Sequence, residues 1–438
     1  MKKRIKLGLI GFGTVGSGVV DLIRKNNLVI EKRLGASLEI KTIADKDLIR
    51  PRNVSTAEAT ITDSVSDILN DPEISIVIEL VGGLLPAKNF IIDAMEKKKH
   101  VVTANKALLA TYGNEIFEKA DEEKVNIGFE ASVGGAIPVI KTIKESLAAN
   151  NIVSVFGIMN GTCNYILTRM TDENLPFEEV LKEAQRLGFA EADPTYDIDG
   201  IDTAHKLAIT LALSYGKRVR LEDIYREGIS NLDRQDVEFA SQLGYRIKLL
   251  AIAIQRGEEI EARIHPTMIP FNHLLSSVNG NYNAFHFEGD HSGSVLLHGQ
   301  GAGMKPTASA VVSDIIDIAR DMEKKVWRRV PLRAFKKDQI QDIKLLSMDD
   351  VRTNYYFRFS AFDRPGVLSK ISGILGSHSI SIASVIQKGR KDEGAVPVVM
   401  TTHESRERDV REALEEIDKL DIVLDKTVLI RIEGGQVQ

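Results

Sequence analysis

The first third of the chain alternates short apolar runs with longer amphipathic segments. Apolar runs rich in β-branched residues occupy four places, at 5–10, 38–44, 75–80 and 100–103. Helical patterns separate them, at 16–25, 64–70 and 88–98. Strand and helix patterns that alternate at this spacing predict a parallel, doubly wound sheet. We therefore expect residues 1–130 to form an α/β domain around such a sheet.

The pattern becomes mixed between residues 131 and 304. Apolar runs predict strands at 152–160, 260–268 and 294–297, and helical periodicity predicts helices at 176–187, 202–215 and 233–253. This region predicts a second, mixed α/β domain. A glycine-rich turn at 299–303 then precedes a long helical pattern over about 305–325, which we expect to pack back on the first domain.

The last part of the chain has its own apolar pattern. Residues 326–350 are charged and lack a core period, which is typical of a linker. Beyond them the predicted order is strand 355–361, helix 367–378, strands 380–387 and 396–402, helix 404–419 and strand 423–432. This βαββαβ order predicts a separate small domain over 351–438.

Composition limits the partners and the compartment. The net charge of the 438-residue chain is −5, so no basic field favours nucleic acid or an anionic membrane. The lone cysteine, Cys163, excludes an intrachain disulfide and fits a reducing compartment. No apolar run approaches the length of a membrane span. We expect a cytoplasmic protein with a small-molecule substrate.

A glycine-rich turn directly follows the first predicted strand and opens the first predicted helix. It reads Gly11-Phe12-Gly13-Thr14-Val15-Gly16. In this context the glycines permit a tight turn, close approach of a pyrophosphate and close packing of helix on strand. The helix N-terminus then favours the phosphate charge. These residues predict a Rossmann-type dinucleotide site.

The second predicted strand ends at Asp45-Lys46, and the two side chains point to different cofactors. An acid at this place favours the ribose 2′-hydroxyl of NAD, and a base favours the 2′-phosphate of NADP. The spacing from the glycines exceeds the usual ~20 residues. The sequence leaves the choice open, with Lys46 compatible with NADP.

Two further segments carry polar groups to the carboxyl end of this sheet or just beyond it. Thr103 and Lys106 follow the fourth predicted strand, where ligands of open α/β sheets bind, so Lys106 is either a site residue or a surface lysine. The glycine-bent run at 129–138 offers the Glu130 carboxylate and several carbonyls, the ligand types of a hard cation. An interdomain hinge is the other interpretation of that run.

The most charged segment of the chain lies at 184–206. Carboxylates crowd around Lys206 there, at Glu191, Asp193, Asp197, Asp199 and Asp202. Asp202 and Lys206 stand four residues apart in a helical pattern, on one face and within reach of each other. This is either an exposed salt bridge after a solvated loop or a cradle for a zwitterionic substrate. The carboxylates would raise the pKa of Lys206, and burial would lower it.

In these motifs and their order, the chain closely resembles the homoserine dehydrogenases of the monofunctional bacterial and archaeal type, with a C-terminal ACT domain. The most specific match is Ala184–Lys206, with Gly188, Asp193-Pro194, Asp197, Gly200, Asp202 and Lys206 in register. The motifs GFGTVG, VVTANK, FEASVGGAIP and NGTCNYIL follow in the family order. The resemblance implies interconversion of L-homoserine and L-aspartate 4-semialdehyde with NAD or NADP, in threonine, methionine and isoleucine biosynthesis.

The resemblance also implies roles for particular residues. Lys206 would transfer the proton at the substrate oxygen, with Lys106 as a second active-site lysine. Glu191 and Asp202 would bind the substrate, supported by Asp197. Cofactor contacts would come from the turn at 11–16, including Phe12, Thr14 and Val15, and from Thr103, Lys106, Gly188 and Gly303. A structural sodium ion would be held by Glu130, Val133, Gly135 and Ile137.

The C-terminal pattern resembles an ACT domain, which implies pairing of sheets between subunits and regulation by an amino acid. Asp363, Gly366 and Val367 occupy the first strand–helix turn, where such ligands often bind. Threonine is the expected effector, and a ligand-free dimerising module is the alternative. We expect a homodimer or homotetramer. The alternative functions are a dehydrogenase of another small amino or hydroxy acid and a non-catalytic nucleotide sensor, which would have lost residues that this chain keeps.

Overall fold

The structure is a computed structural model that describes residues 3–52, 54–56, 58–387 and 395–434. The chain forms two compact units. The first holds the residues up to 155, with 202–223 and 282–343, and the second holds 156–201, 224–281 and the residues from 344 on. The predicted domain 131–304 therefore contributes to both units, because its helix 202–215 packs with the N-terminal domain.

A parallel sheet forms the centre of the first unit. Its order is β3 (Thr60–Thr62), β2 (Ser37–Ala44), β1 (Arg4–Ile10), β4 (Ile74–Glu79), β5 (His100–Thr103) and β6 (Ile127–Gly128). Every neighbouring pair is parallel. This strand order is that of a Rossmann fold, as the alternating pattern predicted. The pattern missed β3 and β6, which are too short to show a period.

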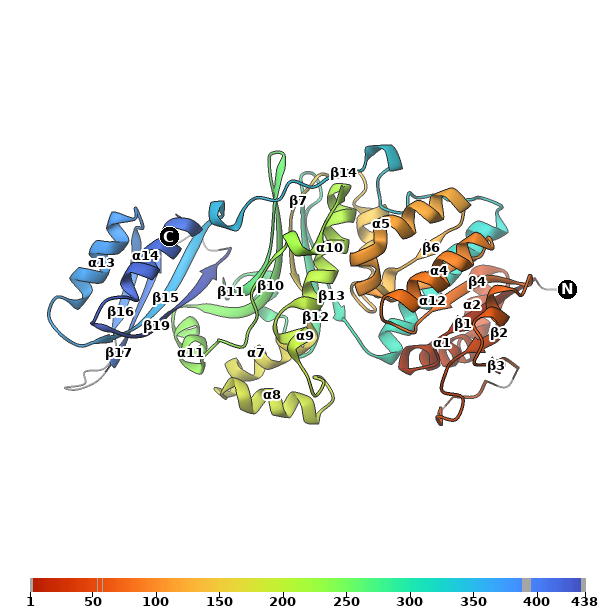
Figure 1. The fold of residues 1–438 in the computed structure, drawn as a ribbon, viewed down its shortest axis with the longest axis horizontal. Coiled ribbons are helices and arrows are strands. Elements are labelled where there is room, and N and C mark those ends of the chain that lie inside the picture. The colour runs from red at the N-terminus through yellow and green to blue at the C-terminus, as the bar shows by residue number, and fades with distance from the viewer. Residues whose placement is uncertain (1–2, 53, 57, 388–394, 435–438) are drawn as a thin grey trace. The chain divides into compact units, whose positions relative to one another are not determined.

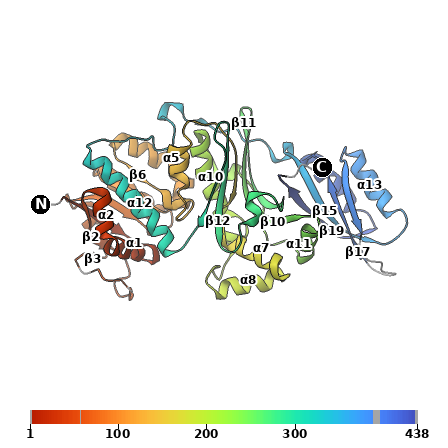
Figure 2. The ribbon, with the colours of Figure 1, turned by 180° about the vertical axis from the view of Figure 1, so that it is seen from behind.

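Helices cover both faces of this sheet. α4 (Leu85–Glu96) and α5 (Lys106–Glu123) pack together on the face seen in Figure 1. α1 (Thr14–Lys25), α2 (Asn27–Leu34) and α12 (Met304–Glu323) cover the opposite face, seen in Figure 2. α12 comes from far along the chain and packs beside α1.

The rest of the first unit surrounds this core. α10 (Ile201–Tyr215) lines an apolar cavity together with α5, and β12 (Tyr282–Gly289) pairs with β13 (Gly293–Gln300) as a hairpin. After β6 come a 3₁₀ turn at Glu130–Ser132, α6 (Val139–Lys141) and a π-helical turn at Thr142–Ser146. The predicted linker is packed, since Leu332 and Arg333 are buried and Arg333 donates to Asn114.

The second unit combines helices with a long antiparallel pair. Its helices include α7 (Gly161–Glu173), α8 (Phe177–Arg186), α9 (Thr195–Ile198) and α11 (Arg234–Gln242). β10 (Tyr245–Arg256) pairs along its whole length with β11 (Glu259–Pro270). The prediction of one helix over 233–253 was wrong. Gly244, at φ +84°, ends the helix region, and the apolar run that follows is buried as a strand.

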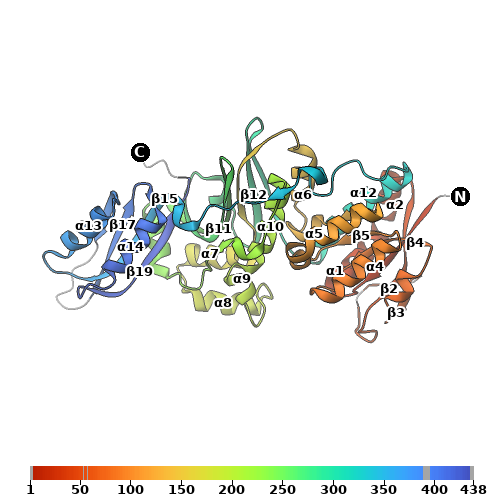
Figure 3. The same cartoon turned by 45° about the horizontal axis from the view of Figure 1, so that its top comes forward.

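The C-terminal domain has the predicted βαββαβ order. β19 (Val423–Ile432), β15 (Arg352–Phe362), β17 (Ala395–Thr402) and β16 (Ile382–Gln387) form its sheet. α13 (Val367–Ser377) and α14 (Glu407–Ile417) cover one face, which Figure 3 shows. β19 also pairs with the end of β11, at Thr267 and Met268. The other face carries Tyr356 and Arg358, which bond to Asp236 of α11.

Candidate active site

Two lysines share one carboxylate in the first unit. The Lys206 ammonium lies 2.7 Å from Asp202 Oδ2, and the Lys106 ammonium lies 3.1 Å from Asp202 Oδ1. The side chains of Asp202 and Lys206 are 5% and 9% exposed, whereas that of Lys106 is 34% exposed. The pair is therefore buried, and the exposed salt bridge considered from the sequence is ruled out. Lys106, Asp202 and Lys206 thus form a row of alternating charges. Lys106 is the most exposed of the three and is accessible to a ligand.

Local sequence explains this row. Asn105 caps α5 by accepting a hydrogen bond from the Leu108 amide at 3.1 Å, which places Lys106 at the first helical position after β5. Asp202 lies in the first turn of α10, where the helix dipole favours a negative charge. Lys206 follows one turn later on the same face.

Glu79 is a polar group that the sequence reasoning missed. It ends β4, is fully buried, and accepts a 2.6 Å hydrogen bond from Thr103 at the end of β5. Its other oxygen accepts from the amides of Val81 and Gly82. Burial raises the pKa of Glu79, and these hydrogen bonds oppose the rise. The carboxylate fixes the loop after β4 at the ligand-binding edge of the sheet. The sequence signal for this group was the acidic residue Glu79 near the end of the otherwise apolar run at 74–80.

The glycine-rich turn has the geometry of a dinucleotide site. Gly11 has φ +97°, and a Cβ there would lie 2.7 Å from the Leu80 carbonyl oxygen. The turn feeds directly into the N-terminus of α1 at Thr14. A Cβ at Gly18 would contact Met304, so Gly303, which precedes α12, lies beside the same helix. The start of α12, just after Gly303, thus packs on α1 within the first unit.

Asp45 and a nearby arginine occupy the end of β2. Asp45 Oδ2 accepts a 2.5 Å hydrogen bond from the Phe12 amide. Arg52 donates to the Phe12 carbonyl at 2.9 Å and approaches Asp45 Oδ1 at 3.3 Å. The Arg52 guanidinium also lies 4.8 Å from the centre of the Phe12 ring. Lys46 is exposed. The sequence reasoning missed Arg52, which is seven residues beyond Asp45.

The predicted cation loop is bent around buried groups. Both carboxylate oxygens of Glu130 accept backbone hydrogen bonds, from Ile140 at 2.8 Å and Lys141 at 2.9 Å. Gly135 has φ +59°, and a Cβ there would lie 2.6 Å from the Gly301 carbonyl oxygen. Among the residues that the structure describes, no cluster of three or more His, Cys, Asp or Glu side chains could hold a metal. A cation at this loop would therefore depend on backbone carbonyls.

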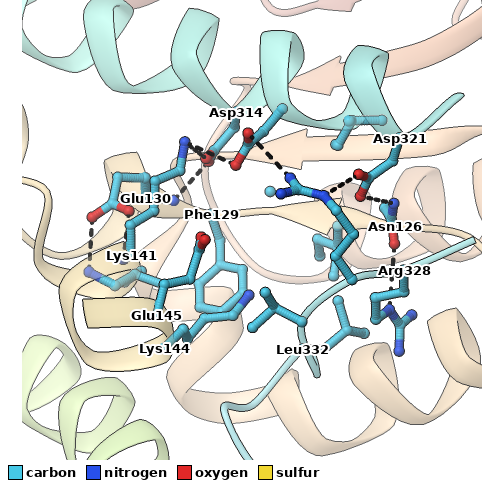
Figure 4. Close-up of a pocket in the computed structure, with 17 residues that line it drawn as sticks. Asn126, Phe129, Glu130, Lys141, Lys144, Glu145, Asp314, Asp321, Arg328 and Leu332 are labelled. Atoms are coloured by element: carbon cyan, nitrogen blue, oxygen red, sulfur yellow. Dashed lines mark hydrogen bonds and ion pairs between the residues drawn. The ribbon is translucent and has the colours of Figure 1, made fainter. Parts of the chain in front are cut away.

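Figure 4 shows the small charged pocket behind this loop, with a volume of about 80 Å³. Asp314 of α12 accepts from the Glu130 amide at 2.8 Å and lies 3.5 Å from the Lys141 ammonium. Burial, and then the Asp314 charge, raise the pKa of Glu130 to about 7. Lys144 lies 5.6 Å from the centre of the Phe129 ring. Buried Asp314 thus links α12 to the loop at Glu130 and to Lys141.

The remaining predicted substrate residues lie in the second unit. Asp197, on α9, accepts a 2.7 Å hydrogen bond from Asn160, which itself caps α7 through the Cys163 amide. Thr162 donates to the Phe189 carbonyl at 2.6 Å. Gly188 has φ +77°, and Glu191 is exposed in the loop between α8 and α9. The signal for Asn160 and Thr162 was the Asn-Gly-Thr sequence at a predicted strand end.

Comparison with known proteins decides the family. A model described as "Homoserine dehydrogenase, NAD binding domain" matches residues 11–130, "Homoserine dehydrogenase" matches 138–316, and "ACT domain" matches 355–421. The chain is 44% identical to homoserine dehydrogenase of Neisseria gonorrhoeae over 432 residues, covering 99% of both chains. The chain belongs to the homoserine dehydrogenases. It is an NAD(P)-dependent oxidoreductase that interconverts L-homoserine and L-aspartate 4-semialdehyde.

Solved structures agree with this family. A homoserine dehydrogenase from Thiobacillus denitrificans matches at a TM-score of 0.93 with 46% identity, covering 99% of both chains. A hyperthermophilic archaeal homoserine dehydrogenase in complex with NADPH matches at 0.61 with 26% identity, covering 72% of this chain and 97% of that one. In the described part of the present enzyme, no helix is long and apolar enough to cross a membrane.

Proposed function

We propose that Lys206 transfers the proton in the dehydrogenase reaction. The observation that carries this proposal is the buried Asp202–Lys206 pair, in which the Asp202 carboxylate also lies 3.1 Å from the ammonium of the more exposed Lys106. When bound, NAD(P) accepts the hydride from the carbinol carbon of L-homoserine. Lys206, as the free amine, takes the hydroxyl proton in that direction, and its ammonium returns the proton to the aldehyde oxygen in reduction.

The other residues of the row orient this amine. Asp202 fixes the Lys206 side chain, and the surrounding burial excludes water that would compete for the proton. Lys106 is the more exposed lysine, so it contacts the substrate oxygen and stabilises developing negative charge there. Glu191, Asp202 and Asp197 are proposed as substrate residues, with Glu191 and Asp202 at the ammonium group of homoserine, on the strength of the family resemblance.

The first test replaces Lys206 by Met. We expect kcat to fall by about 10³-fold, a typical value for loss of a positioned proton-transfer group, while nicotinamide binding measured by fluorescence is retained. Lys182→Met, which removes an exposed lysine of α8, is the matched control and should turn over normally. Near-normal turnover in Lys206→Met would refute the assignment.

We also propose that the enzyme prefers NADP to NAD. Asp45, the acid that would accept the ribose 2′-hydroxyl of NAD, is already bonded to the Phe12 amide and lies near Arg52. Lys46 and Arg50 add exposed positive charge in the same loop. The 2′-phosphate of NADP therefore matches the charges of this site better than the ribose hydroxyls of NAD do.

Lys46→Gln and Arg52→Gln test this preference separately. Each is expected to raise KM for NADP by about 10-fold, the value of one lost charge-assisted contact, and to leave KM for NAD within a factor of about 2. Lys25→Gln, at the exposed end of α1, is the control. If both cofactors lost affinity equally, the loop would be supporting the fold rather than choosing the cofactor.

Further proposals concern the ion, the effector and the assembly. A sodium ion would be held structurally by Glu130 and by the backbone carbonyls of Val133, Gly135 and Ile137, and the amides of Ile140 and Lys141 would fix the Glu130 carboxylate in place. L-Threonine is proposed as the effector of the ACT domain. The turn expected to bind the effector carries Asp363, which accepts a hydrogen bond from Gln387, and Gly366 at φ +90°. The assembly is proposed to be a homodimer or homotetramer in the cytoplasm.

A further inference from the structure

Glu79 is a buried carboxylate at the ligand-binding edge of the parallel sheet, and the reaction proposed above gives it no part. It is the last residue of β4 and is fully buried. The strongest effects that oppose burial on its pKa are hydrogen bonds, first the one from Thr103. A carboxylate buried in this way costs free energy that an apolar side chain would not, so its presence at this edge indicates a role beyond packing.

The charge of Glu79 fixes the direction of the hydrogen bonds at the end of β5. An ionised carboxylate can only accept, so the Thr103 hydroxyl donates to Glu79 Oε2, at 2.6 Å. The Thr103 oxygen is then an acceptor for the Asn105 amide, which donates to it at 3.0 Å. Thr103 is fully buried, so water does not compete for these bonds. Glu79 thereby sets the path of the chain between β5 and α5.

The second oxygen of Glu79 reaches Asn105 by another route. It accepts from the Val81 amide at 2.9 Å and from the Gly82 amide at 3.2 Å. Gly82 and Gly83 both have φ +72°, and the Gly83 carbonyl accepts from Asn105 Nδ2 at 2.7 Å. Asn105 is therefore held at its backbone amide and at its side-chain amide. Both routes lead back to the same carboxylate.

Asn105 passes this constraint to a lysine of the site. Its Oδ1 accepts from the Leu108 amide at 3.1 Å and so caps α5, whose first residue is Lys106. The Lys106 ammonium lies 3.1 Å from Asp202 Oδ1, at the end of a long, flexible side chain. The place of this ammonium therefore depends on where α5 begins.

We propose that Glu79 is a positioning residue of the dehydrogenase reaction and acts by holding Lys106 at the substrate oxygen. Its charge sets the two hydrogen-bonded routes that meet at Asn105, and Asn105 sets the start of α5. The part of Glu79 in the reaction rests on the catalytic role proposed for Lys106, whereas the placement of Lys106 by Glu79 does not.

Glu79→Gln removes the charge and keeps the shape of the side chain. The amide oxygen of the glutamine can still accept from the loop at 81–82, but its NH₂ group faces the Thr103 hydroxyl. Thr103 would then accept from both of its neighbours, and its own buried proton would lose its acceptor. The route through Thr103 is thus broken while the loop contact is kept.

A double-mutant cycle on kcat for homoserine oxidation by the full-length enzyme tests this role. Glu79→Gln is expected to lower kcat by about 10- to 100-fold, as a small misplacement of a reacting group does, and to leave the Kd for NADP within about 2-fold. In a Lys106→Met background the same change should lower kcat by less than about 2-fold, because no ammonium is left to misplace. Glu96→Gln, which removes an exposed charge of α4, is the matched control and should turn over normally.

A second variant and a measurement without turnover guard against misfolding of Glu79→Gln. Asn105→Ser keeps a helix cap and loses the arm that reaches the Gly83 carbonyl, so it should show the same dependence on Lys106. The ¹³C signal of reductively methylated Lys106, assigned by its absence in Lys106→Arg, follows the amine in the ligand-free enzyme. This signal should shift in Glu79→Gln and Asn105→Ser and stay unchanged in Glu96→Gln.

Three results would overturn the proposal. They are equal losses of kcat in the wild-type and Lys106→Met backgrounds, normal kcat in both Glu79→Gln and Asn105→Ser, and an unmoved Lys106 signal in both variants. Normal turnover of Lys106→Met together with a shifted signal would instead refute the catalytic role proposed for Lys106. Glu79 would then place this lysine without serving the reaction.

Discussion

Buried lysines differ in what neutralises them. Lys206 has a carboxylate within 2.7 Å, which is suited to a group that must be held in place. Lys248 of β10 is 2% exposed, and its partners in the described part of the chain are neutral oxygens, on Asn164, Val278 and Asn279. Burial, and then the nearby Arg246 charge, lower the pKa of Lys248 to about 7, and the Asp172 charge only partly opposes them. Residue type alone therefore does not identify a site lysine; its partners do.

Lys248 predicts a pH-dependent stability. Between pH 7 and the ordinary lysine pKa of 10.5, the unfolded chain binds a proton that the native state lacks. The free energy of unfolding should rise with pH over this window, by at most about 1.4 kcal/mol per pH unit, and level off below it. Lys248→Met should lose this slope, measured by urea unfolding at several pH values. Lys182→Met should keep it; equal slopes in all three proteins would contradict the prediction.

At the scale of single elements, the position of the predicted cation loop depends on its contact with the end of β13. The bend at Gly135 has a positive φ and brings the loop against the carbonyls of Gln300 and Gly301, at the end of β13. Sequence suggested a glycine-bent loop but could not give its partner, which lies more than a hundred residues away. The same limit produced the wrong helix at 233–253, because an apolar run does not show whether a neighbouring strand is present to pair with it.

Gly135→Ala tests the loop as an element. The new Cβ meets the Gly301 carbonyl at a positive φ, so we expect a loss of about 1–3 kcal/mol and loss of any sodium-dependent stabilisation. Gly280→Ala is the matched control, since Gly280 has φ +64° with nothing within 4 Å. The measurement is Tm in sodium chloride against choline chloride. A wild-type Tm that is equal in both salts would remove the sodium proposal.

At the scale of the whole chain, the ACT domain is joined to the rest of the second unit by charge as well as by strands. Asp236 of α11 is fully buried and accepts from Arg358 at 2.6 and 2.9 Å and from Tyr356 at 3.0 Å. Replacing Arg358 alone would leave Asp236 as an uncompensated buried charge, whereas replacing Asp236 and Arg358 together would leave no unpaired charge.

Arg358→Met is therefore expected to cost about 3–5 kcal/mol of unfolding free energy, and the double variant Asp236→Leu/Arg358→Met to cost less than the single one. Urea unfolding followed by circular dichroism measures both. Arg364→Met, which removes an exposed side chain stacked on Phe362, should be close to neutral. A double variant less stable than either single one would show that the pair is not the joint's main electrostatic contact.

Local patterns were enough to predict the Rossmann alternation, the phosphate-binding turn, the βαββαβ order and the spacing of Asp202 and Lys206. These depend on neighbours in the chain, so period and spacing reveal them. Contacts between segments far apart in the chain were fixed only by the fold, such as those of Lys106 with Asp202, α12 with α1 and Arg431 with Glu227. Burial and charge pairing are set by these contacts, and no local pattern encodes which distant side chain will supply them.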